Sequence, residues 1–151
     1  MKTLAAAFLA MALSLPAFAC TTMAPPPGFA RLDPNDDYAW RATSAEGVVI
    51  AVRKNKNRPA GNLEFWASAV RYELDRKGYE RDAIDQVRSA DGIDGRRLRY
   101  HTVRQGRPFV LWATVYVTDK KVTVVEAGGD AAHFDRVQPS VDQASRSVEA
   151  G

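Results

Sequence analysis

The sequence is poor in the side chains that most often bind metals or act as nucleophiles. It has one cysteine, Cys20, and two histidines in 151 residues. A single cysteine excludes an intramolecular disulfide, a zinc knuckle and a cysteine-ligated iron–sulfur cluster. The signature motifs of serine hydrolases, zinc proteases, P-loop proteins and dinucleotide-binding proteins are also missing from the sequence. We therefore expect no enzyme activity, no cofactor and no bound metal.

A large charge of one sign is missing as well. The chain has 21 basic and 18 acidic residues, which gives a formal net charge of +3 at pH 7. So small an excess does not create the positive field that nucleic-acid binding requires. A length of 151 residues suits one domain. We expect a single domain and no nucleic-acid partner.

No apolar run is long enough to cross a bilayer, but a shorter run opens the chain. Residues 4–15 are apolar apart from Ser14, and Pro16 follows them. Residues 17–19 read Ala-Phe-Ala, which fits an A-x-A cleavage site. These features predict a secretory signal peptide over residues 1–19. A buried core helix is the alternative, but the segment lacks helix caps and an amphipathic pattern.

Cys20 directly follows the predicted cleavage site. Its position resembles the lipobox of bacterial lipoproteins, in which the cysteine becomes acylated, with palmitate among the usual chains. Ala17 and Phe18 depart from the usual lipobox residues, and ordinary cleavage that leaves a free thiol is the alternative. A lone exposed thiol is a liability in an oxidising compartment, so we favour a membrane anchor on Cys20. Residue 21 is Thr rather than Asp. By resemblance to the sorting rule of enteric lipoproteins, this implies an outer-membrane lipoprotein that faces the periplasm. A soluble periplasmic or secreted protein is the alternative.

The rest of the chain divides into a tether and a domain. Residues 20–36 contain Pro25-Pro26-Pro27-Gly28 and Pro34, which predict an extended tether without a core. Residues 37–149 are the expected domain, long enough to bury a core without a disulfide or a metal.

Hydrophobic periodicity in this domain predicts both strands and helices. Alternating or β-branched runs predict strands over 38–43, 48–52, 84–88, 96–104, 109–118 and 122–127, with a polar loop at 54–59. Asn62 and Gly78 bound a predicted helix over 63–77. Asp130 caps a second helix, in which Pro139 predicts a kink or a restart. Short turns join consecutive strands, so we expect an α+β domain with a mostly antiparallel sheet covered by two main helices.

This order of elements resembles the α/β/α sandwich of PsbP-like proteins. The resembling stretches are Gly47–Arg53, Trp66–Gly78, Gly92–Arg104, Phe109–Ala127 and Phe134–Val148. DcrB-like bacterial lipoproteins belong to this group. The chain especially resembles small envelope lipoproteins of Gram-negative bacteria that share Val125-Glu126-Ala127-Gly128-Gly129 followed by Phe134-Asp135-Arg136. That group is mostly non-catalytic, so the resemblance implies a binding or accessory role and transfers no catalytic residue.

Arginines form the one notable concentration of charge. Arg97 and Arg99 alternate along a predicted strand, and Arg104 and Arg107 flank the next turn. Because arginine binds carboxylates and phosphates bidentately, these four residues are candidate contacts for an anionic envelope component or an acidic partner. The alternative, which we favour, is a solvated face paired with acidic residues such as Glu126.

The remaining candidate side chains favour structural interpretations. Arginines surround His101 in the sequence and disfavour a bound cation, and His133 next to Asp130 indicates surface capping. Trp66 and Trp112 are expected to pack together in the core. The short acidic pairs, Asp82 with Asp85 among them, are expected in loops as turn residues.

Three functions follow, in decreasing order of support. The first is a non-enzymatic envelope lipoprotein whose domain binds an envelope protein or stabilises an assembly. The second is a periplasmic binding or sensor module for a small anionic or lipid ligand, which predicts a roomy pocket between sheet and helix. The third is an unrecognised hydrolase, which would need a cleft with a strongly perturbed carboxylate or His133.

Overall fold

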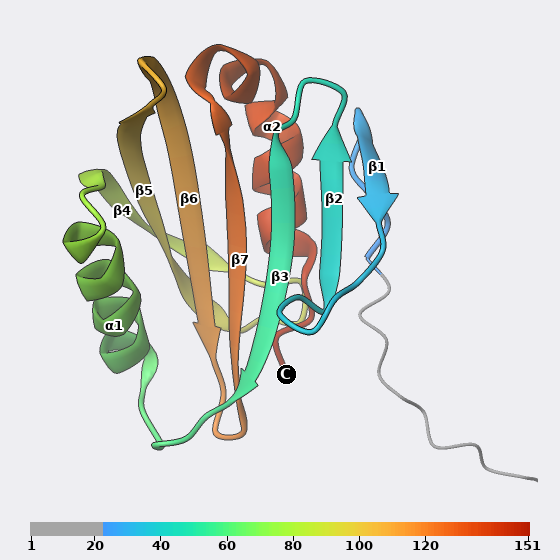
Figure 1. Cartoon of the computed structure of the whole chain (residues 1–151). Helices are drawn as coiled ribbons and strands as arrows, with labels where there is room; N and C mark the ends of the chain where they lie inside the picture. The colour runs from blue at the N-terminus through green and yellow to red at the C-terminus, as the bar shows by residue number, and fades with distance from the viewer. Residues whose placement is uncertain (1–22) are drawn as a thin grey trace, which may run out of the picture.

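A computed structural model describes residues 23–151 as a seven-stranded antiparallel sheet with two helices (Figure 1). The strand order across the sheet is β1-β2-β3-β7-β6-β5-β4. The strands are β1 (Phe29–Leu32), β2 (Trp40–Ser44), β3 (Val49–Lys56), β4 (Glu80–Arg88), β5 (Asp94–Arg104), β6 (Arg107–Val117) and β7 (Lys121–Asp130), and the helices are α1 (Leu63–Arg76) and α2 (Ala131–Ser147). The predicted signal peptide and Cys20 lie outside the described residues.

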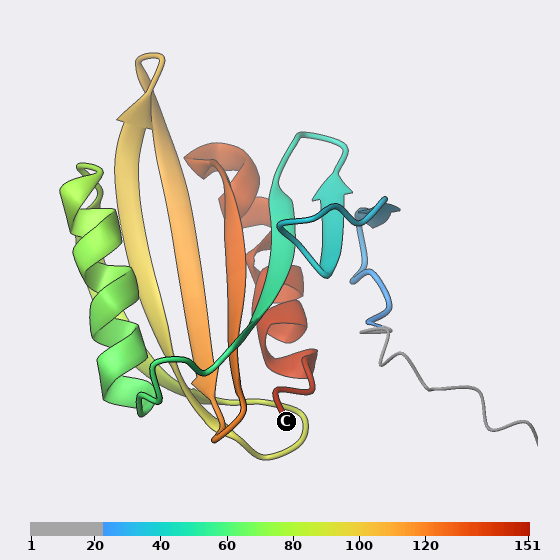
Figure 2. The same ribbon diagram turned by 60° about the horizontal axis from the view of Figure 1, so that its bottom comes forward.

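The two helices lie on opposite faces of the sheet and are displaced from each other along it. Helix α1 packs on β5 and β6, whereas α2 packs on β6 and β7. Figures 1 and 2 show α1 beside the β5–β6 region and α2 behind β7 and β3. The expected α+β sandwich of one domain is confirmed. Because the helices are offset, each leaves part of its own sheet face uncovered.

The larger core lies under α2. Its fully buried side chains include Trp40, Ile50, Tyr116, Phe134 and Val141. The α1 face holds two smaller clusters, centred on Leu98 with Tyr100 and on Val115 with Val122 and Val124. Burial of apolar surface on both faces makes β6 and β7 the centre of the domain.

Both predicted helices form where their capping residues indicate. The Asn62 side chain accepts a hydrogen bond from the backbone N–H of Phe65 at 2.9 Å and so begins α1. Gly78 has φ +85°, the left-handed conformation that commonly follows a helix. Helix α2 runs without interruption through Pro139, so no restart occurs. Burial of Phe134 and Val141 holds the helix on either side of that proline.

The structure describes residues 23–36 of the expected tether, and part of this segment packs on the domain. Residues Phe29–Leu32 pair with β2 as an edge strand, and Met23 is buried beneath Trp40, whose indole N–H donates to the Met23 carbonyl at 2.9 Å. The prediction that residues 20–36 have no core is therefore wrong for residues 23–32. The prolines at 25–27 and 34 flank β1, so each residue of the strand keeps the backbone N–H that pairing requires.

Strands β3 and β4 extend into segments that were expected to be loops. Residues 54–56, expected in a polar loop, continue β3 and pair with β7. Strand β4 begins at Glu80, so Asp82 and Asp85 lie in a strand rather than in loops. Backbone pairing with a neighbouring strand does not depend on apolar side chains, and this is why the polar pattern concealed both extensions.

The last described residues fold back onto the β4–β5 loop. Val148 and Ala150 are buried, and the Asp91 carboxylate accepts hydrogen bonds from the backbone N–H groups of Ala150 and Gly151 at 3.0 and 2.9 Å. The predicted domain end at residue 149 thus stops short of this packing. No helix within residues 23–151 combines the length and the apolarity that crossing a bilayer requires.

Candidate functional site

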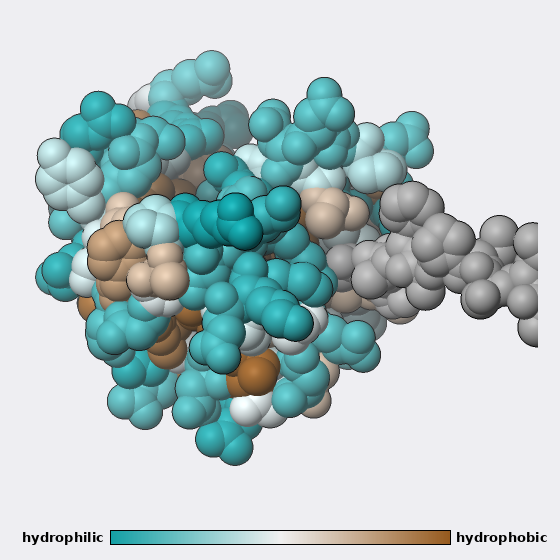
Figure 3. Space-filling view, turned by 90° about the horizontal axis from the view of Figure 1, so that it is seen from below, coloured by the Kyte–Doolittle hydropathy of each residue, from teal (hydrophilic) through white to brown (hydrophobic). Residues whose placement is uncertain are grey.

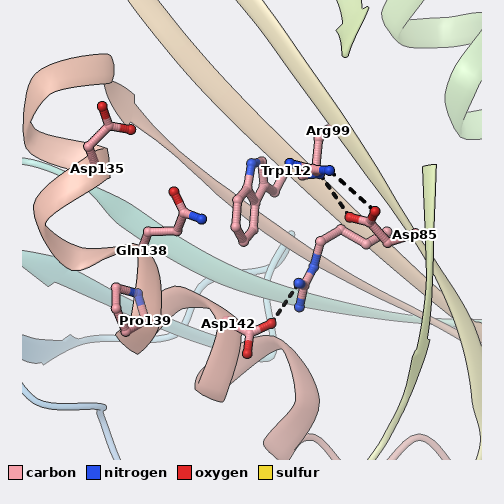
Figure 4. Close-up of a pocket in the computed structure, with 8 residues that line it drawn as sticks. Asp85, Arg99, Trp112, Asp135, Gln138, Pro139 and Asp142 are labelled. Atoms are coloured by element: carbon pink, nitrogen blue, oxygen red, sulfur yellow. Dashed lines mark hydrogen bonds and ion pairs between the residues drawn. The ribbon is translucent and has the colours of Figure 1, made fainter. Parts of the chain in front are cut away.

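A charged pocket lies on the α2 face, where α2 stops short of β4 and β5. We call it the arginine pocket; its volume is about 550 Å³ (Figure 4). Asp85 comes from β4, the arginines from β5 and Trp112 from β6, while α2 supplies the opposite wall. Its lining residues are Asp85, Arg97, Arg99, Trp112, Asp135, Gln138, Pro139 and Asp142.

Arg97 is a buried cation at the base of this pocket. Its side chain is 5% exposed, and its Nη1 donates to an Asp142 carboxylate oxygen at 2.6 Å. The guanidinium lies 4.8 Å from the centroid of the Trp112 ring, within the range of a cation–π contact. Its Nε and Nη2 groups are buried without a hydrogen-bond partner in the described part of the chain. Unpaired charged donors cost stability. The ion pair with Asp142 and the contact with Trp112 offset part of the cost of burying Arg97.

Two of the three carboxylates of the pocket pair with arginine, and the pKa of Asp142 is lowered as a result. Burial raises the pKa of Asp142, but hydrogen bonds from Arg97 and Arg146 outweigh that effect and keep the pKa below its ordinary value. Asp85 lies 2.8 Å from the Nε of Arg99, and both side chains are partly exposed. Asp135 forms no ion pair within residues 23–151. Figure 4 shows the Asp85–Arg99 pair and Asp142 on opposite sides of the cavity. Fixed, paired charges of this kind suit recognition of a polar ligand or surface.

The other two candidate arginines lie elsewhere. Arg104 is on the opposite face of the sheet, with its guanidinium 4.1 Å from the Phe109 ring centroid and a hydrogen bond to the Tyr79 hydroxyl. Arg107 lies 3.7 Å from Asp130. These two arginines line a separate hollow of about 530 Å³ at the β5–β6 turn. The four residues therefore form two sites, and their contact with an anionic partner stays a prediction.

The prediction that Glu126 pairs with the candidate arginines is wrong. Glu126 binds Arg53 on β3 at 3.2 Å, on the face opposite the arginine pocket. Asp142 and Asp85 pair with the arginines instead. Sequence reasoning missed Asp142, which lies 45 residues from Arg97. Its only sequence signal is the spacing to Arg146, four residues later on a predicted helix.

The two histidines also have different neighbours from those expected. His101 faces acidic side chains, with its Nδ1 2.7 Å from Asp82, because β4 lies beside β5 in the sheet. The Nδ1 of His133 is buried and has no partner within the described residues. Asp130 does not pair with it and instead caps α2 by accepting from the Ala132 N–H at 3.2 Å.

The two tryptophans do not pack together. Trp112 lies on the α2 face against Phe134, with ring centroids 5.1 Å apart. Trp66 lies on the α1 face, where its Nε1 donates to the Asn57 side-chain oxygen at 2.7 Å. Alternation along β6 indicates which face Trp112 occupies. Even-numbered residues of that strand face α2, and odd-numbered residues face α1 and Trp66.

A second hollow lies on the α1 face, between α1 and the β3–β7 part of the sheet. We call it the α1 groove; its volume is about 470 Å³. Its apolar lining side chains are Trp66, Ala69, Val70, Leu74, Leu111, Ala113, Val122 and Val124. Its charged lining residues are Arg53, Lys56, Arg58, Glu73, Lys77 and Glu126. The open pocket between sheet and helix that the second functional hypothesis requires is thus present.

Comparison with solved structures relates this architecture to known proteins. The cyanobacterial PsbP protein CyanoP of Synechocystis superposes with a TM-score of 0.61 at 15% identity, covering 83% of this chain and 84% of that one. The chain has a PsbP-like fold. LpqN of Mycobacterium tuberculosis, described as involved in cell envelope biogenesis, matches this chain with a TM-score of 0.65 at 12% identity, covering 82% of this chain and 78% of that one.

A third structural match is PA94 of Pseudomonas aeruginosa, a protein of unknown function. Its TM-score is 0.58 at 13% identity, with coverage of 82% of this chain and 81% of that one. No protein-family model matches the sequence, and no curated protein matches it significantly. At such identities the PsbP-like likeness defines the fold and leaves the function to the site.

Proposed function

We propose that this PsbP-like chain is a non-enzymatic, lipid-anchored accessory protein of the bacterial envelope that binds a protein partner or stabilises an assembly. The signal-peptide pattern and Cys20 support export and anchoring. The described role of LpqN in cell envelope biogenesis supports the compartment. Residues 20–28 link the anchor to the sheet, so the domain would stand close to the membrane.

The arginine pocket is the observation that carries the binding role. It lies between α2 and the part of the sheet that this helix leaves uncovered, and ion pairs already order its charges. A preorganised site loses less side-chain entropy when a partner binds. Asp85 and Asp142 are each committed to an arginine, and the lining contains no histidine, cysteine or serine that Asp135 could assist. This arrangement favours recognition over catalysis.

The anchor is tested by the mass and membrane partition of the mature protein, compared with a Cys20→Ala variant. We expect a mass increase that matches acylation and recovery in the membrane fraction, both lost in the variant. An unmodified mass together with a soluble wild-type protein would reject the anchor and favour a soluble periplasmic or secreted protein.

The binding role is tested by site-specific photo-cross-linking in intact cells. A cross-linking amino acid at Gln138, an exposed residue of the arginine pocket, is expected to capture a discrete envelope protein. The control position is Tyr72, which is 70% exposed on α1, on the other face. Identical adducts from both positions, or none from Gln138, would contradict the assignment of this pocket as the contact surface.

A further inference from the structure

We infer that the α1 groove binds a single-chain anionic amphiphile, with its acyl chain along the apolar floor and its acidic head group among the basic lining residues. This site is separate from the arginine pocket and lies on the opposite face of the sheet. The inference therefore goes beyond the proposed protein-binding role and does not depend on it.

The shape of the groove suits one extended hydrocarbon chain. Its volume of about 470 Å³ falls in the range of small-molecule sites, roughly 300–1,000 Å³. The apolar lining follows β6 and β7 from the level of Val122 to Leu111, which is about 20 Å at the rise of a strand. One acyl layer of a bilayer is about 15 Å thick, so a chain of that length fits within the groove.

The charge of the lining favours an acid at the head of that chain. Four basic residues line the groove, against two acidic residues. Both acids are already bound: Glu126 lies 3.2 Å from Arg53, and Glu73 lies 3.0 Å from Arg76. Lys56 and Arg58 form no ion pair with any residue in the described range. They line the groove where β3 leaves the sheet, and a carboxylate or phosphate there would gain charge-assisted hydrogen bonds.

The head-group end is held in place before any ligand arrives. The Asn57 side chain is buried and donates to the carbonyls of Gly61 and Thr118 at 2.9 Å, while its oxygen accepts from the Trp66 indole. These bonds fix the segment that carries Arg58 against α1. Gly61 is needed there, since a Cβ at that position would lie 2.3 Å from the Phe65 ring. Figure 3, which views the molecule from the side of the β6–β7 turn, shows a mainly hydrophilic surface with small separate hydrophobic patches, as suits a head group in contact with water.

Direct titration of the full mature chain tests the inference. The Cys20→Ala variant removes any acyl anchor, and palmitate and lysophosphatidylglycerol, each below its micelle concentration, are the probes. Calorimetry gives the affinity, and Trp66 fluorescence reports entry, because Trp40 and Trp112 lie on the other face. Tighter binding of palmitate indicates a free fatty acid, and tighter binding of the lysolipid indicates a phospholipid-derived ligand; either result supports the site. Hexadecanol, which lacks the acid, is expected to bind more weakly than palmitate.

Two matched pairs of variants locate the ligand. Ala69→Trp fills the groove from an exposed position on α1 and is expected to weaken palmitate binding by about tenfold or more, the effect of excluding roughly two methylene groups. Its control, Ser68→Trp, adds the same ring at an exposed position outside the groove and is expected to bind normally. Arg58→Gln is expected to weaken binding of the acids but not of hexadecanol, whereas Arg71→Gln, the same charge change outside the groove, leaves both unchanged.

Three results would overturn the inference. The first is an absence of binding to both acids by the folded Cys20→Ala protein. The second is equal palmitate affinity in Ala69→Trp and Ser68→Trp. The third is a groove that binds an acidic helical peptide but neither amphiphile, which would make it a protein-docking surface. None of these results bears on cross-linking at Gln138, so failure here is distinguishable from failure of the proposed function.

Discussion

The two faces of the sheet differ in kind although the same strands build both. The α2 face holds the larger core, with Trp40, Tyr116 and Phe134 fully buried, and its uncovered part carries ion pairs. The α1 face has smaller clusters, and its uncovered part is an apolar groove with a basic lining. The comparison indicates that the α2 face supplies most of the stability, while the α1 face leaves the apolar groove in which we infer ligand binding.

Core truncation on the two faces gives the largest expected effects. Phe134→Ala removes a ring that is 1% exposed and packs edge-on against Trp112, and is expected to cost about 3–5 kcal/mol of unfolding free energy. Leu74→Ala, on the α1 face, is expected to cost about 2–3 kcal/mol, because that residue borders the groove and keeps 8% exposure. Urea denaturation of the unacylated chain measures both. An equal or greater cost for Leu74→Ala would break the comparison.

The arginine pocket offers the next test. Asp142→Ala leaves the buried Arg97 cation unpaired and is expected to destabilise the fold by about 2–3 kcal/mol, less than for a fully buried pair because Asp142 is partly exposed. Asp85→Ala breaks the more exposed pair with Arg99 and is expected to cost less than about 1 kcal/mol.

A double variant separates charge from packing in this pocket. Replacing both partners, as Arg97→Met with Asp142→Leu, removes the uncompensated charge and is expected to recover most of the loss caused by Asp142→Ala. Urea denaturation of the three variants gives the comparison. A double variant as unstable as Asp142→Ala would show that the pair is not the cause.

On the α1 face, the end wall of the groove is tested by Asn57→Ala. This change removes the acceptor for the Trp66 and Gly61 N–H groups and is expected to cost about 1–3 kcal/mol. Trp66 fluorescence and urea denaturation report the change. Asn55→Ala, an exposed neighbour, is the control and is expected to stay within about 0.5 kcal/mol of wild type.

The smallest expected effect concerns acid stability at the β4–β5 loop. Desolvation opposes ionisation of Asp91, but hydrogen bonds from Ser89, Ala150 and Gly151 outweigh it and lower its pKa to about 2 from an ordinary value of 3.8. A lowered folded-state pKa means that the ionised carboxylate stabilises the fold above about pH 4, and that this contribution is lost as the pH falls toward 2.

Asp91→Asn tests that contribution directly. The variant is expected to be less stable than wild type at pH 6 by at most about 1 kcal/mol, since the carboxylate is exposed, and equally stable near pH 2. Thermal unfolding across this pH range gives the difference. A gap between the two proteins that does not change with pH would exclude the carboxylate charge as its cause.

Local patterns in the sequence were sufficient for the main elements of the fold. Asn62 and Gly78 marked α1 because capping depends on neighbouring residues alone. Alternation over residues 109–118 predicted β6, because the alternation of side chains along a strand is also a local pattern. The packing of residues 23–32 was not predictable in this way, because a short segment between prolines is extended both in a tether and in an edge strand.

The candidate site was predicted only in part. The alternation of Arg97 and Arg99 placed them on one face correctly, since strand geometry fixes that relation. Their partners, Asp142 on α2 and Asp85 on β4, depend on which elements lie beside β5, and so does the carboxylate next to His101. The separation of Trp66 from Trp112 depends on which face each helix covers.

The sequence by itself determined the presence of six of the seven strands, β2 to β7, the two capped helices and the one-domain α+β class, because these follow from local periodicity and short motifs. The export signal stays a prediction. Tertiary structure alone decided the offset of the two helices, the burial of Arg97 and the division of the surface into an arginine pocket and an α1 groove. These features arise where residues distant in the chain meet, and no local pattern encodes which distant segment covers which part of a sheet.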